Sequence, residues 1–345
     1  MLHSHDVLIL GRGIAGAVLA ETLLQRGLRV HVFDRKRPGN ASMAAAGVVN
    51  PVVLKRDVIS WRAAELLPMA EAFYTGLEAR LATRFWHPME LVKLFPSERE
   101  TAQWERAMQQ PGTAPFIDRR QQPEVDAAPL HAPHGHGTVH RSAWLDVPAM
   151  LKAQRQQMQQ QGILSEVDIN EADIEHSDTG VRIGVHAAPW LIRCTGPFAI
   201  LPGMVPVKGE GITVRLPGLR VDRMLHRAVF LLPKGGEDYR IGATFKWDQV
   251  WEGPTDEARA WLLDKLAKLT PVPAEVLDQW AGVRPTSADR RPIMGRSGAH
   301  EAVLNGLGAR GVLLAPWCAA HLADHLFAGK PLEGEVRCDR PFPQR

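Results

Sequence analysis

The segment "DVLILGRGIAGAVLAETLLQRGLRVHVFD", which begins at Asp6, constrains the fold of this chain more than any other stretch. One apolar run, residues 7–10, ends directly at Gly11, and a second, residues 30–33, ends at Asp34. Between them, Gly11, Gly13 and Gly16 form the pattern G-x-G-x-x-G. The segment therefore predicts a buried strand, a helix and a second, parallel strand, the first unit of a doubly wound α/β fold.

The same segment predicts a binding site for a dinucleotide. Gly11 makes the tight turn, Gly13 lets the backbone approach a pyrophosphate, and Gly16 lets the helix lie close to the sheet. Free N–H groups of the first helical turn face the phosphates, and the Asp34 carboxylate accepts hydrogen bonds from the adenosine ribose. A glycine turn without a ligand is the alternative interpretation. The predicted contact residues are Gly11, Gly13, Ile14, Ala15, Gly16, Asp34 and Arg35.

The next segment bears on which dinucleotide is bound, because FAD and NAD share the ADP half that Asp34 recognises. The stretch "RKRPGNASMAAAGVVNPVV" supplies the hydroxyl of Ser42 and a run of small residues that ends in Ala45, Ala46 and Gly47. Such a run can bring backbone N–H groups close to a second part of an extended cofactor. A loop followed by the start of a buried helix is an equally open interpretation at this point.

Taken together, motifs along nearly the whole chain resemble the D-amino-acid-oxidase family of FAD enzymes. They are the glycine segment with Asp34, then "SMAAAGVVNP", "AWLDVPAMLKAQRQQMQQQG", "LIRCTG", "YRIGATF", "GVRPTSADRRPIMG" and "GLGARGVLLAPWCAAHLADHL". The last two in tandem are the most specific, and they are most similar to glycine oxidase and to the flavin half of the tRNA-modifying enzyme MnmC. The resemblance implies a doubly wound, Rossmann-like FAD-binding domain interleaved with an α+β substrate domain built on an antiparallel sheet.

A second G-x-G-x-x-G, formed by Gly306, Gly308 and Gly311, does not predict a second nucleotide site. The helix-like run after Pro316 leads into a proline-rich tail without a convincing second strand, and a second nucleotide-binding unit requires one. The resemblance implies that this loop lies against the flavin ring, where backbone N–H groups stabilise negative charge on the reduced ring. It also implies contacts from the turn after residues 191–194. The implied contact residues are Val167, Thr195, Gly196, Gly308, Ala309, Arg310 and Gly311.

Two arginines are candidates for the chemistry. Arg284, in "GVRPTSADRRPIMG", matches the family arginine that grips a substrate carboxylate, and a guanidinium can do so with two parallel hydrogen bonds. An ordinary ion pair is the alternative for Arg284. Arg310 is the second candidate, although its backbone alone could matter. Lys246 could assist oxygen reduction or be a solvated lysine, and pocket, core and surface roles stay open for Asn50, Lys55, Arg56 and Trp61.

The length of 345 residues predicts two lobes, and the resemblance implies that the two are interleaved in the sequence. Residues 1–85, 140–200 and 282–345 are expected to form the FAD-binding domain, and residues 86–139 and 201–281 the substrate domain. Within the latter, Ser97 and Glu100 predict a capping box that opens a helix, and Thr255 or Asp256 caps another.

Composition argues against several other classes of site. The three cysteines lie far apart, which indicates a reducing compartment, and Cys318 is expected to be buried in a helix. In sarcosine oxidase, a member of the family, a cysteine just after the arginine motif holds the flavin covalently. The matching stretch "RPTSADR" has no cysteine, so we expect non-covalent FAD. The histidine-rich "HAPHGHGTVH" is expected to be a mobile surface loop, and no metal site is predicted. No signal peptide or apolar membrane span is evident, so the cytoplasm is the expected location, without a membrane partner.

The leading functional hypothesis is an FAD-dependent oxidase or dehydrogenase that oxidises a C–N bond of an amino acid or N-substituted glycine, with a small amine or amino acid as its partner. The first alternative is MnmC-like removal of a carboxymethyl group from a modified tRNA wobble uridine. A net charge of +3 is weak for tRNA binding. The second alternative is a non-catalytic flavoprotein. Substrate, electron acceptor and oligomeric state stay open.

Overall fold

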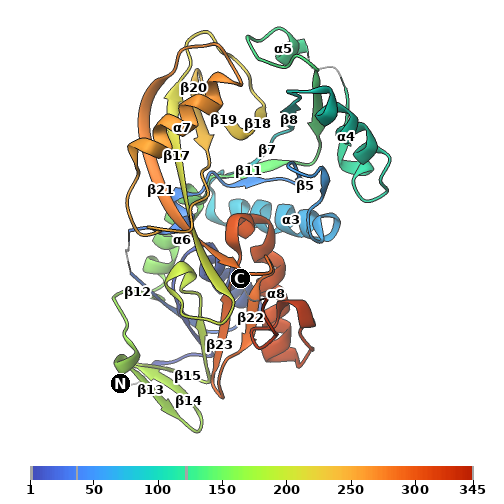
Figure 1. The fold of residues 1–345 in the computed structure, drawn as a ribbon. Coiled ribbons are helices and arrows are strands. Elements are labelled where there is room, and N and C mark those ends of the chain that lie inside the picture. The colour runs from blue at the N-terminus through green and yellow to red at the C-terminus, as the bar shows by residue number, and fades with distance from the viewer. Residues whose placement is uncertain (1–2, 36–37, 121–122, 344–345) are drawn as a thin grey trace.

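The computed structural model describes residues 3–35, 38–120 and 123–343, and two large sheets dominate it. A six-stranded sheet lies in the lower half of Figure 1, and an eight-stranded sheet forms much of the upper half. The first sheet is mainly parallel and the second mainly antiparallel, so the α/β fold class expected from the sequence is confirmed. The proposed domain boundaries remain a prediction.

The six-stranded sheet has the doubly wound arrangement that the opening glycine segment predicts. Its pairs are parallel except for the last, which is antiparallel. Because the carboxyl ends of parallel strands meet at one edge, the turns that follow Leu10, Asp34, Arg193 and Asn305 lie close together. The strands in spatial order are β12 (Leu164–Glu166), β3 (Val30–Asp34), β2 (Val7–Leu10), β16 (Trp190–Arg193), β23 (Glu301–Asn305) and β22 (Ile293–Arg296).

Four helices pack beside this sheet and against one another: α1 (Ile14–Gln25), α3 (Ala63–Leu81), α6 (Val147–Gln160) and α8 (Gly311–Ala328). Helix α8 begins at Gly311 rather than after Pro316, which corrects the sequence interpretation. Pro316 has no N–H group for the carbonyl of Val312, and the Tyr74 hydroxyl donates a hydrogen bond of 2.9 Å to that carbonyl instead. No strand follows α8 in the part of the tail that the structure describes, as expected.

The eight-stranded sheet forms the second lobe, with α7 (Asp256–Ala267) packed on it. The Thr255 hydroxyl caps α7, as one of the two predicted caps, by accepting a hydrogen bond of 3.2 Å from Ala258 N. The long strands β17 and β21 carry the sheet toward the first lobe (Figure 1). In spatial order the strands are β21 (Glu275–Ser287), β17 (Met204–Arg215), β20 (Asp238–Gly242), β19 (Val229–Gly235), β18 (Met224–Arg227), β8 (Leu91–Leu94), β10 (His136–Val139) and β9 (Ile117–Asp118).

Two local predictions in this lobe need correction. Ser97 caps α4 (Glu98–Met108), but the Glu100 carboxylate lies 3.5 Å from Lys93 Nζ, so only half of the capping box forms. His136–Val139 form β10, so that part of the histidine-rich segment is a strand and not a loop.

Smaller elements complete the molecule. They are β1 (His3–Ser4), β15 (His186–Ala188), β14 (Gly180–Ile183) and β13 (Ile174–Ser177) in one sheet; β4 (Val48–Val49), β11 (Ala143–Leu145) and β7 (Trp86–Pro88) in another; the pair β5 (Val52–Val53) and β6 (Val58–Ile59); and the short helices α2 (Ala41–Ala44) and α5 (Pro123–Asp126). No helix in the described ranges is long and apolar enough to cross a bilayer.

Candidate functional site

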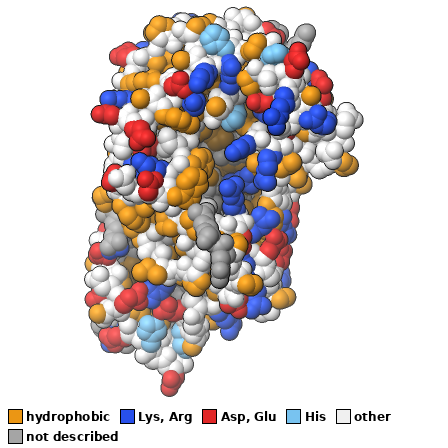
Figure 2. Space-filling view, viewed as in Figure 1, with side chains coloured by type: hydrophobic (Ala, Val, Ile, Leu, Met, Phe, Trp, Pro, Cys, Tyr) orange, Lys and Arg blue, Asp and Glu red, His pale blue; other side chains and the backbone are white. Residues whose placement is uncertain are grey.

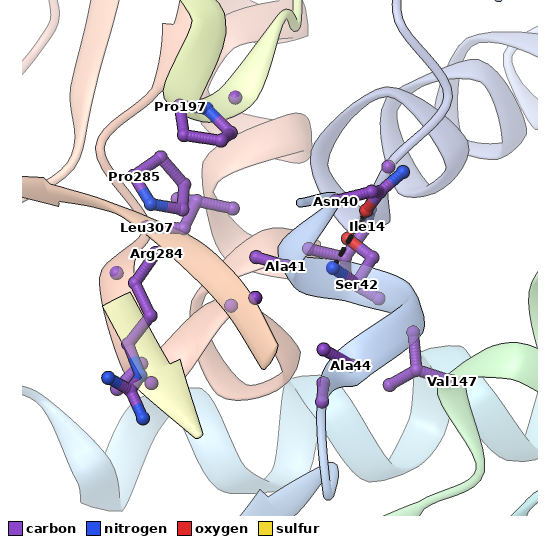
Figure 3. Close-up of a pocket in the computed structure, with 18 of the residues that line it drawn as sticks. Ile14, Asn40, Ala41, Ser42, Ala44, Val147, Pro197, Arg284, Pro285 and Leu307 are labelled. Carbon is purple, nitrogen blue, oxygen red and sulfur yellow. Dashed lines mark hydrogen bonds between the residues drawn. The ribbon is translucent and has the colours of Figure 1, made fainter. Parts of the chain in front are cut away.

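A cavity of about 540 Å³ lies where the carboxyl ends of the parallel strands meet the eight-stranded sheet. Its lining runs from the glycine turn and Asp34 to Arg284 on β21. Figure 3 shows Arg284 and Pro285 on one side and Ile14, Asn40 and Ser42 on the other. In Figure 2 the face of the molecule is hollowed, with Lys and Arg side chains along one side of the hollow and hydrophobic side chains along the other.

The first glycine motif closes one end of the cavity, and its glycines are required for different reasons. Gly11 has φ +94°, and an added Cβ would lie 2.5 Å from the carbonyl oxygen of Cys194. A Cβ on Gly16 would lie 1.9 Å from the Gly11 carbonyl oxygen, so Gly16 packs beneath the turn and does not line the cavity. Gly13 does line it, and an added Cβ there would meet only Ser42 Oγ, at 3.1 Å.

Asp34 ends β3 at the cavity, and two arginines that the sequence interpretation missed surround it. Its carboxylate accepts a hydrogen bond of 3.0 Å from Arg12 N and lies 3.7 Å from the guanidinium of Arg155. Burial raises the pKa of Asp34, while the Arg12 hydrogen bond and charge oppose this shift. Arg35 forms an ion pair with Asp168, and Val167 lines the same end of the cavity.

The segment of small residues forms a second wall. Ser42 Oγ accepts a hydrogen bond of 2.9 Å from Ile14 N, so this hydroxyl caps α1 at the cavity. Arg240, which the sequence interpretation also missed, braces the run by donating to the carbonyls of Ala44 and Ala45, each at 3.1 Å. Gly47 has φ +72° and packs on the backbone of Leu145, because an added Cβ would lie 1.9 Å from its carbonyl oxygen. Ala45, Ala46 and Gly47 all line the cavity.

The second glycine motif faces this same cavity and forms no second nucleotide unit. Residues Gly308–Arg310 form a single turn of 3-10 helix directly before α8. A Cβ on Gly311 would lie 3.0 Å from Ile14, so the two glycine motifs pack against each other. The Thr195–Gly196 turn after β16 is held by Asn305 Nδ2, which donates to Gly196 O at 3.0 Å. The lining residues from these turns are Thr195, Gly196, Gly308, Ala309, Arg310 and Gly311.

Arg284 projects into the far end of the cavity and has no carboxylate partner among the described residues. Its guanidinium donates hydrogen bonds to the carbonyls of Lys208, at 3.3 Å, and Thr244, at 3.1 Å, and it lies 4.2 Å from the ring centroid of Phe245. Desolvation lowers the pKa of Arg284 to about 10, so the group stays charged at neutral pH. Gly209 gives it room, since a Cβ there would lie 2.1 Å from the guanidinium.

Arg310 lies at the cavity beside further cations. Burial lowers its pKa first, and the charges of Arg290, Arg56 and Arg291 lower it further. Arg291 is paired with Glu335 at 2.9 Å, whereas Arg56, Arg290 and Arg310 form no ion pair with any described carboxylate.

The residues whose roles the sequence left open divide into two groups. Asn50 and Lys55 line the cavity. Arg56, Trp61 and Lys246 do not line it. The Trp61 indole donates to Glu335 at 3.1 Å, and Lys246 Nζ lies 3.2 Å from Gln249 Oε1 and 3.6 Å from Glu257.

Comparison with known proteins gives a match over residues 6–325 to the family described as FAD dependent oxidoreductase. The chain belongs to this family. It is 26% identical to glycine oxidase of Geobacillus kaustophilus, over 94% of this chain and 93% of the relative. It is 27% identical to the tRNA 5-methylaminomethyl-2-thiouridine biosynthesis bifunctional protein MnmC of Maricaulis maris, over 98% of this chain and 55% of the relative. The chain thus spans about half the length of that relative.

Two solved structures share the fold of this chain. Iminodiacetate oxidase from Chelativorans sp. BNC1 matches with a TM-score of 0.77 and 20% identity, over 97% of this chain and 100% of the other. Glycine oxidase from Geobacillus kaustophilus matches with a TM-score of 0.78 and 23% identity, over 96% of each chain.

The cavity fits the cofactor of the family. Gly13 leaves space beside a helix N-terminus for a pyrophosphate, Asp34 lies one strand away for a ribose, and the same cavity continues to Gly308 and Arg284. Among the cysteines, Cys194 lines this cavity, and burial raises the pKa of its thiol, which makes it a poor nucleophile. Non-covalent binding of FAD remains a prediction. Cys318 is fully buried in α8, as expected.

Proposed function

We propose that this FAD dependent oxidoreductase oxidises a C–N bond of an amino acid or N-substituted glycine, and that Arg284 holds the carboxylate of the substrate. The observation that carries the proposal is the state of Arg284: a desolvated guanidinium in the FAD cavity, bonded only to carbonyl groups and without a carboxylate partner among the described residues. Desolvation of a cation is costly unless an anion compensates it, and a substrate carboxylate would supply that anion.

The names of similar proteins support the same chemistry. Glycine oxidase, iminodiacetate oxidase and L-proline dehydrogenase are each named for a substrate that carries a carboxylate next to a C–N bond. A cation that grips this shared carboxylate leaves the rest of the cavity to distinguish one substrate from another.

The protein's own residues would contribute orientation and exclusion of water. Bound FAD supplies the acceptor for the hydride that leaves the substrate carbon. Two hydrogen bonds from Arg284 would fix the carboxylate and hence the direction of the adjacent C–H bond. Phe245 and Phe230 line the cavity, where their rings would limit the access of water to a bound substrate. The His226 imidazole also lines the cavity, and burial lowers its pKa to about 4, so the ring is neutral at pH 7.

The test is reduction of the flavin without oxygen. FAD-loaded protein is mixed with amino acids, N-substituted glycines and their decarboxylated analogues, and bleaching of the oxidised-flavin absorbance is followed. We expect acids to bleach the flavin and analogues without the carboxylate to react poorly. If both react equally well, Arg284 does not anchor a carboxylate. If no compound bleaches the flavin, the non-catalytic alternative gains support.

Substitution of Arg284 tests whether this residue binds the carboxylate of the substrate. Arg284→Ala should lower kcat/KM, with a loss of transition-state stabilisation of about 2–4 kcal/mol, because a charged hydrogen-bonding partner is lost from a desolvated site. Arg284→Lys keeps the charge but loses the forked geometry, so affinity should still fall. The exposed Arg259 on α7 provides the control, and Arg259→Ala should leave kcat/KM and FAD content unchanged. Loss of FAD from the Arg284 variants would indicate a structural role instead.

A second candidate function is the MnmC-like removal of a carboxymethyl group from a modified wobble uridine of tRNA. It is favoured by the cations Arg56, Arg290 and Arg310, which form no ion pair with a described carboxylate, and by the exposed indoles of Trp247 and Trp251. Cations can bind phosphates, and exposed aromatic rings can stack on bases. Turnover of tRNA that carries the modification would support this function. The double variant Arg56→Gln/Arg290→Gln should then lose tRNA turnover while it keeps turnover of free amino acids.

A further inference from the structure

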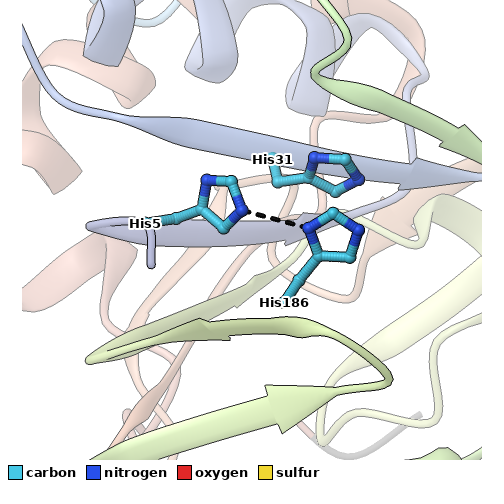
Figure 4. A group of neighbouring side chains, drawn as sticks. All are labelled: His5, His31 and His186. Carbon is cyan, nitrogen blue, oxygen red and sulfur yellow. Dashed lines mark hydrogen bonds between the residues drawn. The ribbon is translucent and has the colours of Figure 1, made fainter. Parts of the chain in front are cut away.

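Three imidazoles, of His5, His31 and His186, lie together at the six-stranded sheet (Figure 4). His5 stands between β1 and β2, His31 is the second residue of β3, and His186 begins β15. One ring nitrogen from each lies within 4.8 Å of the others. None of the three lines the FAD cavity, so the cluster is independent of the proposed function.

Two of the rings are already at a distance suited to a metal ion. His5 Nε2 and His186 Nδ1 are 3.0 Å apart and share a hydrogen bond. Two nitrogens bound to one tetrahedral zinc ion at the usual bond length are about 3.3 Å apart. A small movement would therefore replace the shared hydrogen bond by two metal bonds. The shared proton would move to the other nitrogen of its ring, so both imidazoles stay neutral.

His31 offers the third ligand atom. Its Nε2 lies 2.9 Å from Ser165 Oγ, while its Nδ1 is buried and has no hydrogen-bond partner among the described residues. The residue is only 2% exposed, so an unpaired nitrogen here is unfavourable unless something binds it. A histidine whose second nitrogen is held by a hydrogen bond while the first points to a ligand is the usual arrangement at metal sites.

Backbone hydrogen bonds fix the positions of the three histidines relative to one another. His5 N donates to Ala187 O at 2.9 Å, β1 pairs with β15 so that His3 faces His186, and His31 pairs with Leu8. The rings of His31 and His186 are stacked at 3.7 Å with an interplanar angle of 22°. Because an imidazole binds a metal ion in its own plane, the ring of His186 must rotate, and its partial exposure leaves room for this movement.

The three rings are neutral near pH 7, which is the form that binds metals. Burial is the first cause that lowers the pKa of each ring, and the pKa of His31 falls to about 3. Repulsion among the imidazoles, including His3, adds to the effect. Arg29 lowers the pKa of His5 further, while Asp6 raises it.

We propose that His5, His31 and His186 bind a divalent transition metal ion of the class that prefers imidazole, such as Zn²⁺, Ni²⁺ or Cu²⁺. Three protein nitrogens leave a fourth position for water or for His3, whose ring centroid is 5.7 Å from that of His186. The ion acts as a structural clamp that joins β1 and β15 to β3.

The test uses tag-free, FAD-loaded protein and Zn²⁺ as the probe. After equilibrium dialysis in micromolar zinc, the metal content of the wild type should reach about one ion per chain, and zinc should raise its melting temperature. His5→Gln and His186→Gln replace partly exposed rings and should abolish both effects, while FAD content and the circular dichroism spectrum stay as in the wild type. Ser165→Ala should weaken zinc binding about tenfold, because it removes the group that orients His31.

The matched control is His134→Gln, in the histidine-rich segment far along the chain. It should bind zinc like the wild type. Equal zinc binding by wild type and the His5 and His186 variants would overturn the proposal and assign the metal to other histidines. An absence of saturable binding to the wild type would overturn it as well.

Discussion

At the scale of single residues, Gly13 is needed for binding of the cofactor, whereas Gly11 is needed for the fold. A Cβ there would meet only Ser42 Oγ, at 3.1 Å, whereas a Cβ on Gly11 would collide with the Cys194 carbonyl at 2.5 Å from a backbone with φ +94°. We therefore expect Gly13→Val to fold but to lose FAD, because its side chain fills the space of the pyrophosphate. Gly11→Ala should instead lose stability. FAD occupancy after dialysis, compared with circular dichroism and melting temperature, checks both variants. Full FAD occupancy in folded Gly13→Val protein would place the phosphates elsewhere.

At the scale of one element, helix α8 depends on a hydrogen bond from outside the helix. The Tyr74 hydroxyl, fully buried, satisfies the Val312 carbonyl that Pro316 leaves without a partner. Tyr74→Phe should lower the free energy of unfolding by about 1–3 kcal/mol, the cost of an unsatisfied buried carbonyl. In a Pro316→Ala background the new N–H group can bind that carbonyl, so Tyr74→Phe should cost less. Urea unfolding of the four proteins measures this coupling. Equal costs in the two backgrounds would contradict the proposed role of Tyr74.

At the scale of the whole molecule, buried neutral histidines should make stability depend on pH. Burial lowers the pKa of His31 to about 3 and that of His226 to about 4. Below about pH 6.5 the unfolded chain therefore binds more protons than the folded chain. Between about pH 6.5 and the pKa that each histidine has in the folded state, each histidine lowers the free energy of unfolding by up to about 1.4 kcal/mol per pH unit as the pH falls. Above about pH 7 these groups should contribute no slope. Asp34 and Asp57, whose pKa values burial raises, oppose the loss at the acidic end.

Urea midpoints from pH 8 to pH 5.5 check this expectation, because the range avoids most of the carboxylate titration. The variant His226→Gln should show a shallower decline below pH 6.5 than the wild type. A stability that is flat from pH 8 to pH 5.5 would show that the histidines are protonated equally in the folded and unfolded chain.

The sequence by itself determined the features that depend on neighbours in the chain. Local periodicity, turn chemistry and glycine spacing predict three such features. They are the unit from β2 to Asp34, the Thr255 cap of α7, and the lack of a second nucleotide unit after Gly311 in the described tail. The resemblance of longer motifs to known enzymes also predicted the family of the chain and its cofactor.

Only the tertiary structure decided the features that join distant segments. Gly209 makes room for Arg284 across the β17–β21 register, Arg240 braces the run of small residues, and Tyr74 lets α8 begin before its proline. The histidine cluster joins residues 5, 31 and 186. Contacts of this kind depend on strand register and on which faces of the elements pack together, and the periodicity of a single segment carries no information about its distant partner.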